Sequence, residues 1–422
     1  MEKLKYKALT FDDVLLLPKY SDFLPSEASI ESKLTKNIVL KTPLISAAMD
    51  TVTESKMAIS LAETGGIGII HKNNSIEEQA AQVKTVKKYE SGIVRDPVTI
   101  NSKQSIGELR QLTSELSISG MPVVDDQKLK GIVTSRDFRY AENMDSEVSS
   151  IMTPFEKLIT VEEGFSQEDV MKLMYKNRIE KILVLDSNSN LSGLVTMKDI
   201  EKSAQHPNAT KDLSGRLQVG AALGTSEDTL ERAQALFESG VDVFVVDSAH
   251  GHSKNVIETI KMLKEKFKDV DIIGGNIATA EAATELVRAG ADAVKVGMGP
   301  GSICTTRIIA GIGVPQISAI LEIKKALVGR DINIIADGGI RFSGDIAKAI
   351  AAGADSVMLG SLFAGTEEAP GKVELFQGRS FKTYRGMGSI GAMTERDDAN
   401  RYLQEDVEAD KLVPEGIEGR VP

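Results

Sequence analysis

The sequence contains a single cysteine, Cys304, among its 422 residues. One thiol excludes an internal disulfide framework and therefore favours a reducing compartment. The chain begins without the apolar core of a signal peptide, and it has no apolar run long enough to span a bilayer. We therefore expect a cytoplasmic protein with no membrane partner.

Histidine and clustered basic residues are also scarce. Only four histidines occur, and the close pair His250 and His252 has no acidic or cysteine partner nearby in the sequence, so we predict no transition-metal site there. The net charge of −11, without a run of Lys or Arg, argues against a nucleic-acid partner. What remains is an ordinary globular composition, 41% hydrophobic and 26% charged, long enough for two or three domains.

An internal repeat lies between residues 93 and 205. The matching positions, at one constant offset, are Gly131 and Gly193, Thr134 and Thr196, and Asp137 and Asp199. Each copy predicts a strand, a tight turn, a second strand and a helix that begins near the Thr-x-x-Asp. The region resembles a tandem pair of CBS domains (a Bateman module), and this implies purine nucleotide binding through the Thr-x-x-Asp. The same pattern also caps helices, and the two roles are compatible.

Outside the repeat, short apolar runs alternate with amphipathic segments, of which 227–239, 253–267 and 280–289 are examples. The predicted strands are 44–49, 68–71, 219–223, 243–247, 272–275, 293–297, 332–337 and 356–360. Strands that are apolar on both faces are typical of a parallel sheet covered by helices. Eight such units predict an α/β fold, a TIM (β/α)8 barrel, with the repeat inserted between the second and third units. No Gly-x-Gly-x-x-Gly follows an early strand, which disfavours a doubly wound sheet.

The cysteine lies in the segment 296–306, Val-Gly-Met-Gly-Pro-Gly-Ser-Ile-Cys-Thr-Thr. Alternate glycines allow the backbone to approach a ligand closely and to adopt left-handed conformations. A thiol on such a loop is a candidate nucleophile. A small buried hydrophobic residue near a turn is an equally good interpretation of the cysteine alone.

Polar residues and glycines also follow the other predicted strands, where a TIM barrel builds its active site. They are Ser46 and Asp50, Asp247, Gly275 and Asn276, Asp337 to Gly339 with Arg341, and Gly360 with Ser361. The loops after the last two strands commonly bind phosphate, so we expect a phosphorylated substrate at Gly339, Gly360 and Ser361. Asp337 is placed to accept hydrogen bonds from a ribose.

Together these features resemble the IMP dehydrogenase family over essentially the whole chain. The motifs are residues 9–14 (LTFDDV), 46–51 (SAAMDT), 297–306, 336–340 (ADGGI) and 384–389 (YRGMGS). The resemblance implies oxidation of IMP to xanthosine 5′-monophosphate with NAD+, the committed step toward guanine nucleotides. It also implies a homotetramer and a requirement for potassium.

The resemblance further assigns roles to individual residues. Cys304 attacks carbon 2 of the hypoxanthine, hydride passes to NAD, and water hydrolyses the covalent thioimidate. The substrate residues are Ser46, Ser302, Asp337, Gly339, Gly360, Ser361, Tyr384, Met387, Gly388 and Glu415. The residues that contact NAD are Asp247, Asn276, Gly297 and Gly299. The carbonyl oxygens of Gly299, Gly301 and Cys304 are the ligands of the potassium ion.

A charge-rich segment, residues 391–416, carries Arg401 and Tyr402. By itself it is typical of a solvated loop. The resemblance implies a mobile flap that enters the vacated NAD site, where Arg401 activates water with help from Thr306 and Tyr402. Because a guanidinium is normally never deprotonated, either burial depresses its pKa or it orients water while another group takes the proton.

The predicted domains are residues 1–92 and 206–422 for the barrel and 93–205 for the CBS pair. The resemblance implies several dozen further residues after Pro422, with the final helix and a segment completing the cation site of a neighbouring subunit. We therefore expect a shortened chain, and the sequence does not decide whether this chain is itself active. Two alternatives are GMP reductase, disfavoured by the insert and by Arg401 and Tyr402, and a nucleotide sensor with an inactive barrel.

Overall fold

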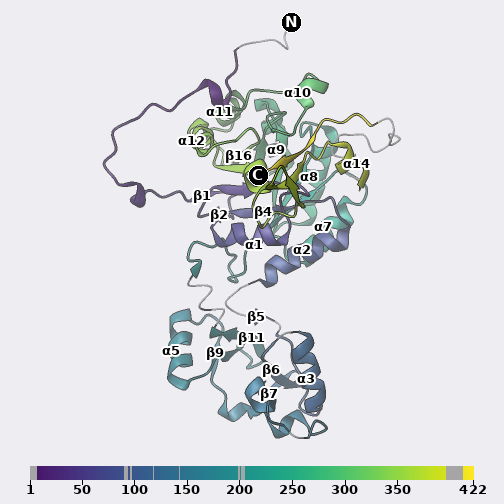
Figure 1. Cartoon of the computed structure of the whole chain (residues 1–422). Coiled ribbons are helices and arrows are strands. Elements are labelled where there is room, and N and C mark those ends of the chain that lie inside the picture. The colour runs from purple at the N-terminus through teal and green to yellow at the C-terminus, as the bar shows by residue number, and fades with distance from the viewer. Residues whose placement is uncertain are drawn as a thin grey trace. The chain divides into compact units, whose positions relative to one another are not determined.

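The computed structural model describes residues 7–89, 94–95, 97–116, 118–141, 143–197, 200, 205–395 and 412–422 (Figure 1). The chain divides into two compact units. The first comprises Met1–Tyr89, Asn208–Leu213 and Leu217–Pro422, and the second comprises Glu90–Pro207 and Ser214–Arg216. No helix in the described part of the chain is long and apolar enough to cross a membrane.

The first unit is built on a closed parallel barrel with the strand order β12-β13-β14-β15-β16-β17-β3-β4. The strands are β3 (Leu44–Ser46), β4 (Ile67–Ile70), β12 (Gly220–Leu223), β13 (Val243–Asp247), β14 (Asp271–Ile277), β15 (Ala293–Val296), β16 (Asn333–Asp337) and β17 (Ser356–Leu359). Each predicted strand is present, with its ends moved by a few residues at most. The prediction of a TIM barrel is confirmed.

Helices follow the strands along the chain and cover the barrel (Figure 1). They are α1 (Ser55–Glu63), α2 (Ile76–Lys88), α7 (Thr229–Glu238), α8 (Lys254–Lys266), α9 (Ala280–Ala289), α11 (Gln316–Ala326) and α12 (Ser343–Ala352), with the short α10 (Thr306–Ile309) and α13 (Ser361–Ala364). Helix α9 shows why these segments are helical. Thr279 caps its first turn, its apolar face is buried, and Gly290 ends it at φ +108°.

The barrel strands have two apolar faces because successive side chains alternate. In β13, Val243 and Val245 belong to the core inside the barrel, whereas Phe244 and Val246 belong to the core between strands and helices. All four are fully buried. This alternation fixes which residue at the end of each strand points into the barrel.

A small antiparallel sheet in the first unit combines β18 (Val373–Phe376), β19 (Arg379–Arg385) and β20 (Glu418–Val421). Helix α14 (Ile390–Glu395) follows β19. Arg385 of β19 forms an ion pair with Asp50, whose Oδ2 lies 2.6 Å from Arg385 Nη2. This pair fastens the sheet to the loop after β3.

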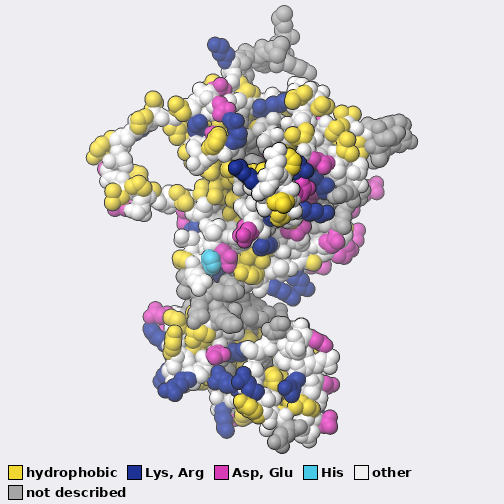
Figure 2. All heavy atoms as spheres, viewed as in Figure 1, with side chains coloured by type: hydrophobic (Ala, Val, Ile, Leu, Met, Phe, Trp, Pro, Cys, Tyr) yellow, Lys and Arg dark blue, Asp and Glu magenta, His cyan; other side chains and the backbone are white. Residues whose placement is uncertain are grey.

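The N-terminal part of the chain contains the turns η1 (Phe11–Asp13) and η2 (Pro25–Glu27) and a ribbon of β1 (Ser32–Lys33) and β2 (Val39–Leu40). Between η1 and β1 the chain is extended and carries large exposed apolar side chains, and Figure 2 shows them lying along this segment. Leu15, Leu17 and Tyr20 are 86%, 85% and 92% exposed. A surface this apolar is typical of an interaction site.

The chain leaves the first unit after α2 and returns to it at Asn208. Here the buried Lys87 donates hydrogen bonds to three residues of the returning chain and its neighbours. Its Nζ donates to Asp212 Oδ2 at 3.0 Å, to the carbonyl of Leu217 at 2.9 Å and to Asp242 Oδ2 at 2.9 Å. One ammonium group therefore joins both ends of the interruption.

The second unit contains two sheets, β5-β11-β10-β9 and β6-β7-β8. Its elements are β5 (Val94–Arg95), α3 (Ile106–Glu115), β6 (Gly120–Asp125), β7 (Lys128–Thr134), α4 (Ser135–Phe138), η3 (Val148–Ser150), β8 (Thr153–Pro154), η4 (Phe155–Lys157), β9 (Thr160–Glu162), α5 (Gln167–Asn177), β10 (Lys181–Leu185) and β11 (Leu191–Thr196). The hairpins β6-β7 and β10-β11 correspond to the two copies of the sequence repeat.

Candidate active site

The inward-facing positions of three barrel strands end in charged residues. Two residues beyond the interior Val245, Ala293 and Ile335 stand Asp247, Lys295 and Asp337. Because side chains alternate, all three point into the same end of the barrel. The sequence thus places two carboxylates and one ammonium at the carboxyl ends of β13, β15 and β16, where TIM barrels build active sites.

Lys295 is the centre of this cluster, and its side chain is only 2% exposed. Its Nζ lies 2.9 Å from Asp247 Oδ1 and 3.0 Å from Asp337 Oδ2, and it also donates to Asn276 Oδ1. Asn276 Nδ2 in turn donates to Asp337 Oδ2 at 2.8 Å and to the carbonyl of Gly297 at 2.8 Å. A buried charge with this many partners is held in one geometry.

Cys304 lies on the loop between β15 and α10 and is partly exposed. Its Sγ is 3.2 Å from Thr306 Oγ1. The thiol lines a cavity of about 130 Å³ together with Asp247, Asn276, Lys295 and Asp337. The nucleophile candidate therefore faces the buried charges, which favours the catalytic interpretation of the lone cysteine over simple packing.

Glycine is required at the start of this loop. A Cβ on Gly297 would lie 1.9 Å from the carbonyl oxygen of Asp337, and Gly297 has φ +156°. No side chain fits at that distance. The glycine therefore lets the cysteine loop pass directly beside the end of β16.

The main chain near the C-terminus supports the cysteine loop. Thr305 N donates to the carbonyl of Glu415 at 2.9 Å, and Ile417 N donates to the carbonyl of Ile303 at 2.9 Å. Glu415 N also donates to the carbonyl of Gly388 at 3.0 Å. These bonds bring the predicted base-contact residues Gly388 and Glu415 beside the cysteine.

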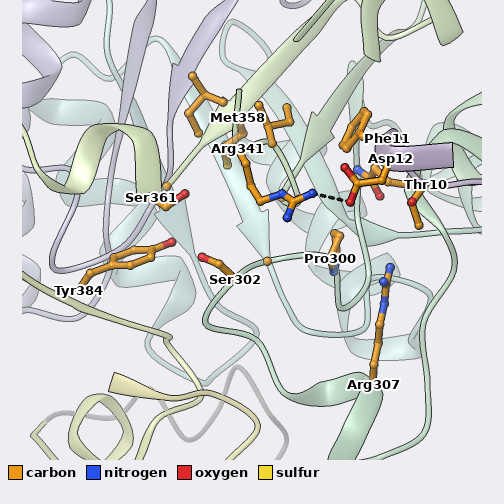
Figure 3. Close-up of a pocket in the computed structure, with 17 residues that line it drawn as sticks. Thr10, Phe11, Asp12, Pro300, Ser302, Arg307, Arg341, Met358, Ser361 and Tyr384 are labelled. Atoms are coloured by element: carbon orange, nitrogen blue, oxygen red, sulfur yellow. Dashed lines mark hydrogen bonds and ion pairs between the residues drawn. The ribbon is translucent and has the colours of Figure 1, made fainter. Parts of the chain in front are cut away.

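A second cavity, of about 340 Å³, adjoins the first along the loop (Figure 3). Its lining includes Ser302, Gly339, Gly360, Ser361 and Tyr384, the residues predicted to hold a phosphate. Figure 3 shows the hydroxyl groups of Ser302, Ser361 and Tyr384 directed toward one space. Neutral hydroxyl and amide donors of this kind can surround an anion.

The tyrosine of this cavity stays protonated. Burial raises the pKa of Tyr384 well above its ordinary value, and the negative Asp337 raises this pKa further. A neutral phenol donates its hydrogen bond across the whole physiological pH range. Its neighbour Gly360 must be a glycine because a Cβ there would lie 2.6 Å from the Tyr384 hydroxyl.

The structure brings most predicted site residues to these two cavities. Met387, Gly299 and Gly301 join the residues already named in the lining of the smaller cavity. Lys295 was not predicted, although a lysine inside the apolar run Ala-Val-Lys-Val of β15 is a signal that could have been read. Arg401 and Tyr402 lie outside the described residues.

Ser46 is not brought to the site. Its neighbour Ile45 points into the barrel, so Ser46 points outward toward the helices. It is fully buried and its hydroxyl accepts a hydrogen bond from Thr53 Oγ1 at 2.8 Å. The following residues, Ala47 to Met49, line the smaller cavity instead.

Two places bear on metal binding, the His250 and His252 pair, where no metal was predicted, and the cysteine loop, where potassium was predicted. His252 has an acidic neighbour that the sequence did not indicate, since its Nε2 lies 2.9 Å from Glu285 Oε2. Among the described residues, however, no group of three His, Cys, Asp or Glu side chains could hold a metal ion. On the cysteine loop, the carbonyl of Gly301 accepts the amide of Cys304 at 3.1 Å and keeps a second lone pair. Hard carbonyl oxygens of this kind suit potassium.

Comparison with known proteins is consistent with this site. Residues 8–422 match a family described as the IMP dehydrogenase / GMP reductase domain. The chain is 56% identical over 421 residues to inosine-5′-monophosphate dehydrogenase of Haemophilus influenzae and 55% identical over 422 residues to that of Escherichia coli K12. Each match covers 100% of this chain and 86% of the relative.

Among solved structures, a GMP reductase of Trypanosoma brucei in complex with guanosine 5′-monophosphate matches with a TM-score of 0.86 and 42% identity. The match covers 100% of this chain and 88% of that one. It therefore spans the inserted residues 93–205 as well. The insert was taken above as evidence against a reductase, and this argument is wrong because a protein named as a reductase matches over the same length.

Proposed function

The chain belongs to the IMP dehydrogenase / GMP reductase family, and we propose that it oxidises IMP to xanthosine 5′-monophosphate with NAD+ and water. The observation that carries the proposal is the position of Cys304. Its thiol lines the smaller cavity together with the buried cluster of charges, and its loop continues into the lining of the larger cavity, whose hydroxyl and amide donors suit a phosphate. A nucleotide whose phosphate occupied the larger cavity would then have its base on the side of the thiol.

The covalent step assigned to Cys304 is addition of its sulfur to carbon 2 of the hypoxanthine ring. Loss of the hydride from that carbon leaves a thioimidate, and bound NAD+ supplies the hydride acceptor. Covalent catalysis of this kind divides a difficult oxidation into two easier steps. Thr306, 3.2 Å from the sulfur, is placed to orient the thiol.

Ser302, Gly339, Gly360, Ser361 and Tyr384 would hold the phosphate of the substrate. Asp337 would accept hydrogen bonds from the ribose while Lys295 fixes the position of its carboxylate. Met387, Gly388 and Glu415 would contact the base. This division agrees with the lining of the two cavities and with the main-chain bonds around Glu415.

Hydrolysis of the thioimidate returns the free thiol and releases the product. We assign water activation to Arg401, assisted by Tyr402 and Thr306, on the basis of the family resemblance. Thr306 is the one member of this set among the described residues. A guanidinium orients water and stabilises negative charge without itself losing a proton, so a neighbouring group accepts the proton.

The nicotinamide side of the site is assigned to Asp247, Asn276, Gly297 and Gly299. Asp247 and Asn276 are both fixed by the buried ammonium of Lys295. Carbonyls of Gly299, Gly301 and Cys304 would hold potassium, which would order the cysteine loop.

The second unit is assigned a regulatory role as a tandem CBS pair. A cavity of about 250 Å³ within it is lined by residues of both repeat copies, including Thr134, Asp137, Arg136 and Lys181. The cavity lining holds three cations, Arg136, Lys157 and Lys181, and together with the threonine and serine hydroxyls they suit a purine nucleotide. Thr134 is also the N-cap residue of α4, where Asp137 Oδ2 accepts from its main-chain N at 2.7 Å and from its Oγ1 at 2.8 Å.

A homotetramer is proposed as the working assembly. The extended apolar segment around Leu15, Leu17 and Tyr20 is a suitable contact for a second copy of the chain. A cytoplasmic location is consistent with the single thiol.

The test is NADH formation from IMP and NAD+ in the presence of potassium, with this chain and its Cys304→Ala variant. We expect NADH from the parent chain and none from the variant, with both folded by circular dichroism. GMP with a reduced nicotinamide cofactor is the control reaction. Consumption of that cofactor, without NADH formation from IMP, would identify a GMP reductase. A folded chain inactive in both reactions would favour the nucleotide sensor.

A further inference from the structure

The larger cavity carries charged residues that the proposed function does not use. The charged side chains in its lining are Asp12, Arg307 and Arg341. Arg307 donates from Nη2 to the carbonyl of Val314 at 2.8 Å, and its stem packs against Gly299 and Gly313, so it is committed to the cysteine loop. Arg341 instead forms an ion pair with Asp12 across the rim of the cavity (Figure 3).

Arg341 has a fixed main chain and an exposed side chain. The main-chain N of Arg341 donates to Asp345 Oδ2 at 3.0 Å, which fixes its backbone at the start of α12. Its side chain is nevertheless 52% exposed, so the guanidinium can move while its backbone stays in place.

Asp12 belongs to the turn η1, which is docked firmly on the barrel. Phe11 beside it is buried, and Lys348 Nζ donates to the carbonyl of Phe11 at 2.8 Å. The main chain of Leu9 and the residue Ser318 exchange two further hydrogen bonds. A carboxylate is therefore held at the mouth of a cavity whose other donors suit an anion.

We propose that Arg341 recognises the phosphate of the substrate and that its ion pair with Asp12 keeps it at the cavity until the substrate binds. Before the substrate binds, Arg341 neutralises the charge of Asp12. When a phosphorylated substrate enters, the guanidinium turns to the phosphate, which offers more negative charge and more acceptor oxygens than one carboxylate. This inference rests on the proposed function, since it takes the anion to be the phosphate of the substrate.

Two physical arguments support the exchange. Exposed ion pairs are weak, so the release of Asp12 is easily offset by a charge-assisted bond in a cavity that already surrounds the phosphate. In addition, Asp12 repels a phosphate unless a cation lies between them. Arg341 is the cation of this lining that already contacts Asp12 and that is not tied to the cysteine loop as Arg307 is.

The experiment measures binding of IMP by calorimetry to the whole chain and to Arg341→Gln, Asp12→Asn and the double variant. Binding of inosine, which lacks the phosphate, is measured by competition. Arg330→Gln is the matched control, because it removes an arginine that lines neither cavity. Loss of an exposed pair leaves the fold intact, so all four variants are expected to fold.

We expect Arg341→Gln to raise the Kd for IMP about tenfold and to leave the Kd for inosine unchanged. Asp12→Asn should leave IMP binding unchanged or strengthen it. The double variant should bind IMP more tightly than Arg341→Gln alone, since no unpaired carboxylate then faces the phosphate. In turnover, Arg341→Gln should change KM and not kcat.

Equal effects on IMP and inosine, or no effect on IMP, would overturn the proposal for Arg341. A double variant no better than Arg341→Gln would overturn the role of Asp12. Because binding needs no turnover, failure of the chain to oxidise IMP would count against the proposed function and leave this test intact.

Discussion

The two cavities at the carboxyl end of the barrel differ in how their charged side chains are buried and paired. Beside Cys304, the ammonium of Lys295 is 2% exposed and is surrounded by the oxygens of Asp247, Asn276 and Asp337. At the rim of the larger cavity, Arg341 and Asp12 are 52% and 67% exposed and contact each other. The first arrangement cannot rearrange without leaving a buried charge unpaired, whereas the second can.

The difference matches what each cavity is proposed to recognise. A reacting ring needs groups that are fixed before it arrives, because preorganised charges need not reorganise during reaction. A phosphate is a symmetrical anion that must enter from water and leave again. The buried cluster at the ends of β13, β15 and β16 suits the first task, and the exposed pair between η1 and the loop after β16 suits the second.

The largest effect is expected from Lys295→Met. It leaves the carboxylates of Asp247 and Asp337 buried without their cation, so unfolding should become easier by about 3–5 kcal/mol. Urea unfolding followed by circular dichroism measures this loss. Lys324→Met, which removes a half-exposed lysine 3.8 Å from Asp355, is the control and should change stability by less than about 1 kcal/mol.

An intermediate effect is expected from Arg385→Gln. Asp50 and Arg385 are largely buried, with side-chain exposures of 8% and 18%, and they hold the strand that leads to Met387. We expect a loss of about 2 kcal/mol in unfolding free energy and a higher KM for IMP. Asp50→Asn combined with Arg385→Gln should be less damaging than the sum of the single changes. Strict additivity would show that the pair does not act as a unit.

A pH-dependent effect is expected from Tyr384→Phe. Unfolded tyrosine ionises near pH 10, and burial together with Asp337 raises the pKa of folded Tyr384 above that value. The stability linked to this shift is complete below about pH 10 and is lost as pH rises further. The parent should therefore lose up to about 1.4 kcal/mol more per pH unit than Tyr384→Phe in that range. Unfolding midpoints above and below pH 10 test this, and parallel profiles would contradict it.

The smallest effect is expected from Asp12→Asn. Because the pair with Arg341 is exposed, its removal should change the unfolding free energy by less than about 1 kcal/mol. The same urea titration measures it. A loss as large as that of Arg385→Gln would mean that the exposed pair is as rigid as the buried one, and the contrast between the cavities would fail.

The barrel could be predicted because its strands are short, apolar on both faces and separated by amphipathic helices. The larger cavity could also be predicted as the place for a phosphate, since Gly339, Gly360 and Ser361 line it and follow the last two strands of a fold that commonly binds phosphate there. These features depend on local sequence and on a rule of the fold.

Other parts of the site depend on which face of a strand a residue occupies. Lys295 was overlooked because its strand was treated as apolar on both faces. Ser46 was assigned to the site from its place near a strand end and from the resemblance, without regard to which face of β3 it occupies. Counting alternate residues from the interior Ala293 and Ile45 would have turned Lys295 inward and Ser46 outward. The contact of Asp12 with Arg341 could not be found this way, because 329 residues separate them.

The hydrogen bonds of Lys87 across the interruption of the barrel bear on how the second unit could change during evolution. It joins Asp212, Leu217 and Asp242 around the point where the barrel is interrupted, so the chain departs and returns at one place. For the stability of the barrel, the second unit therefore acts as an insertion whose two ends are held close together. The entropy of closing a loop grows slowly with its length, by only about 0.6 kcal/mol for each doubling. The interruption could therefore be lengthened, exchanged or shortened during evolution with little change in the stability of the barrel that carries it.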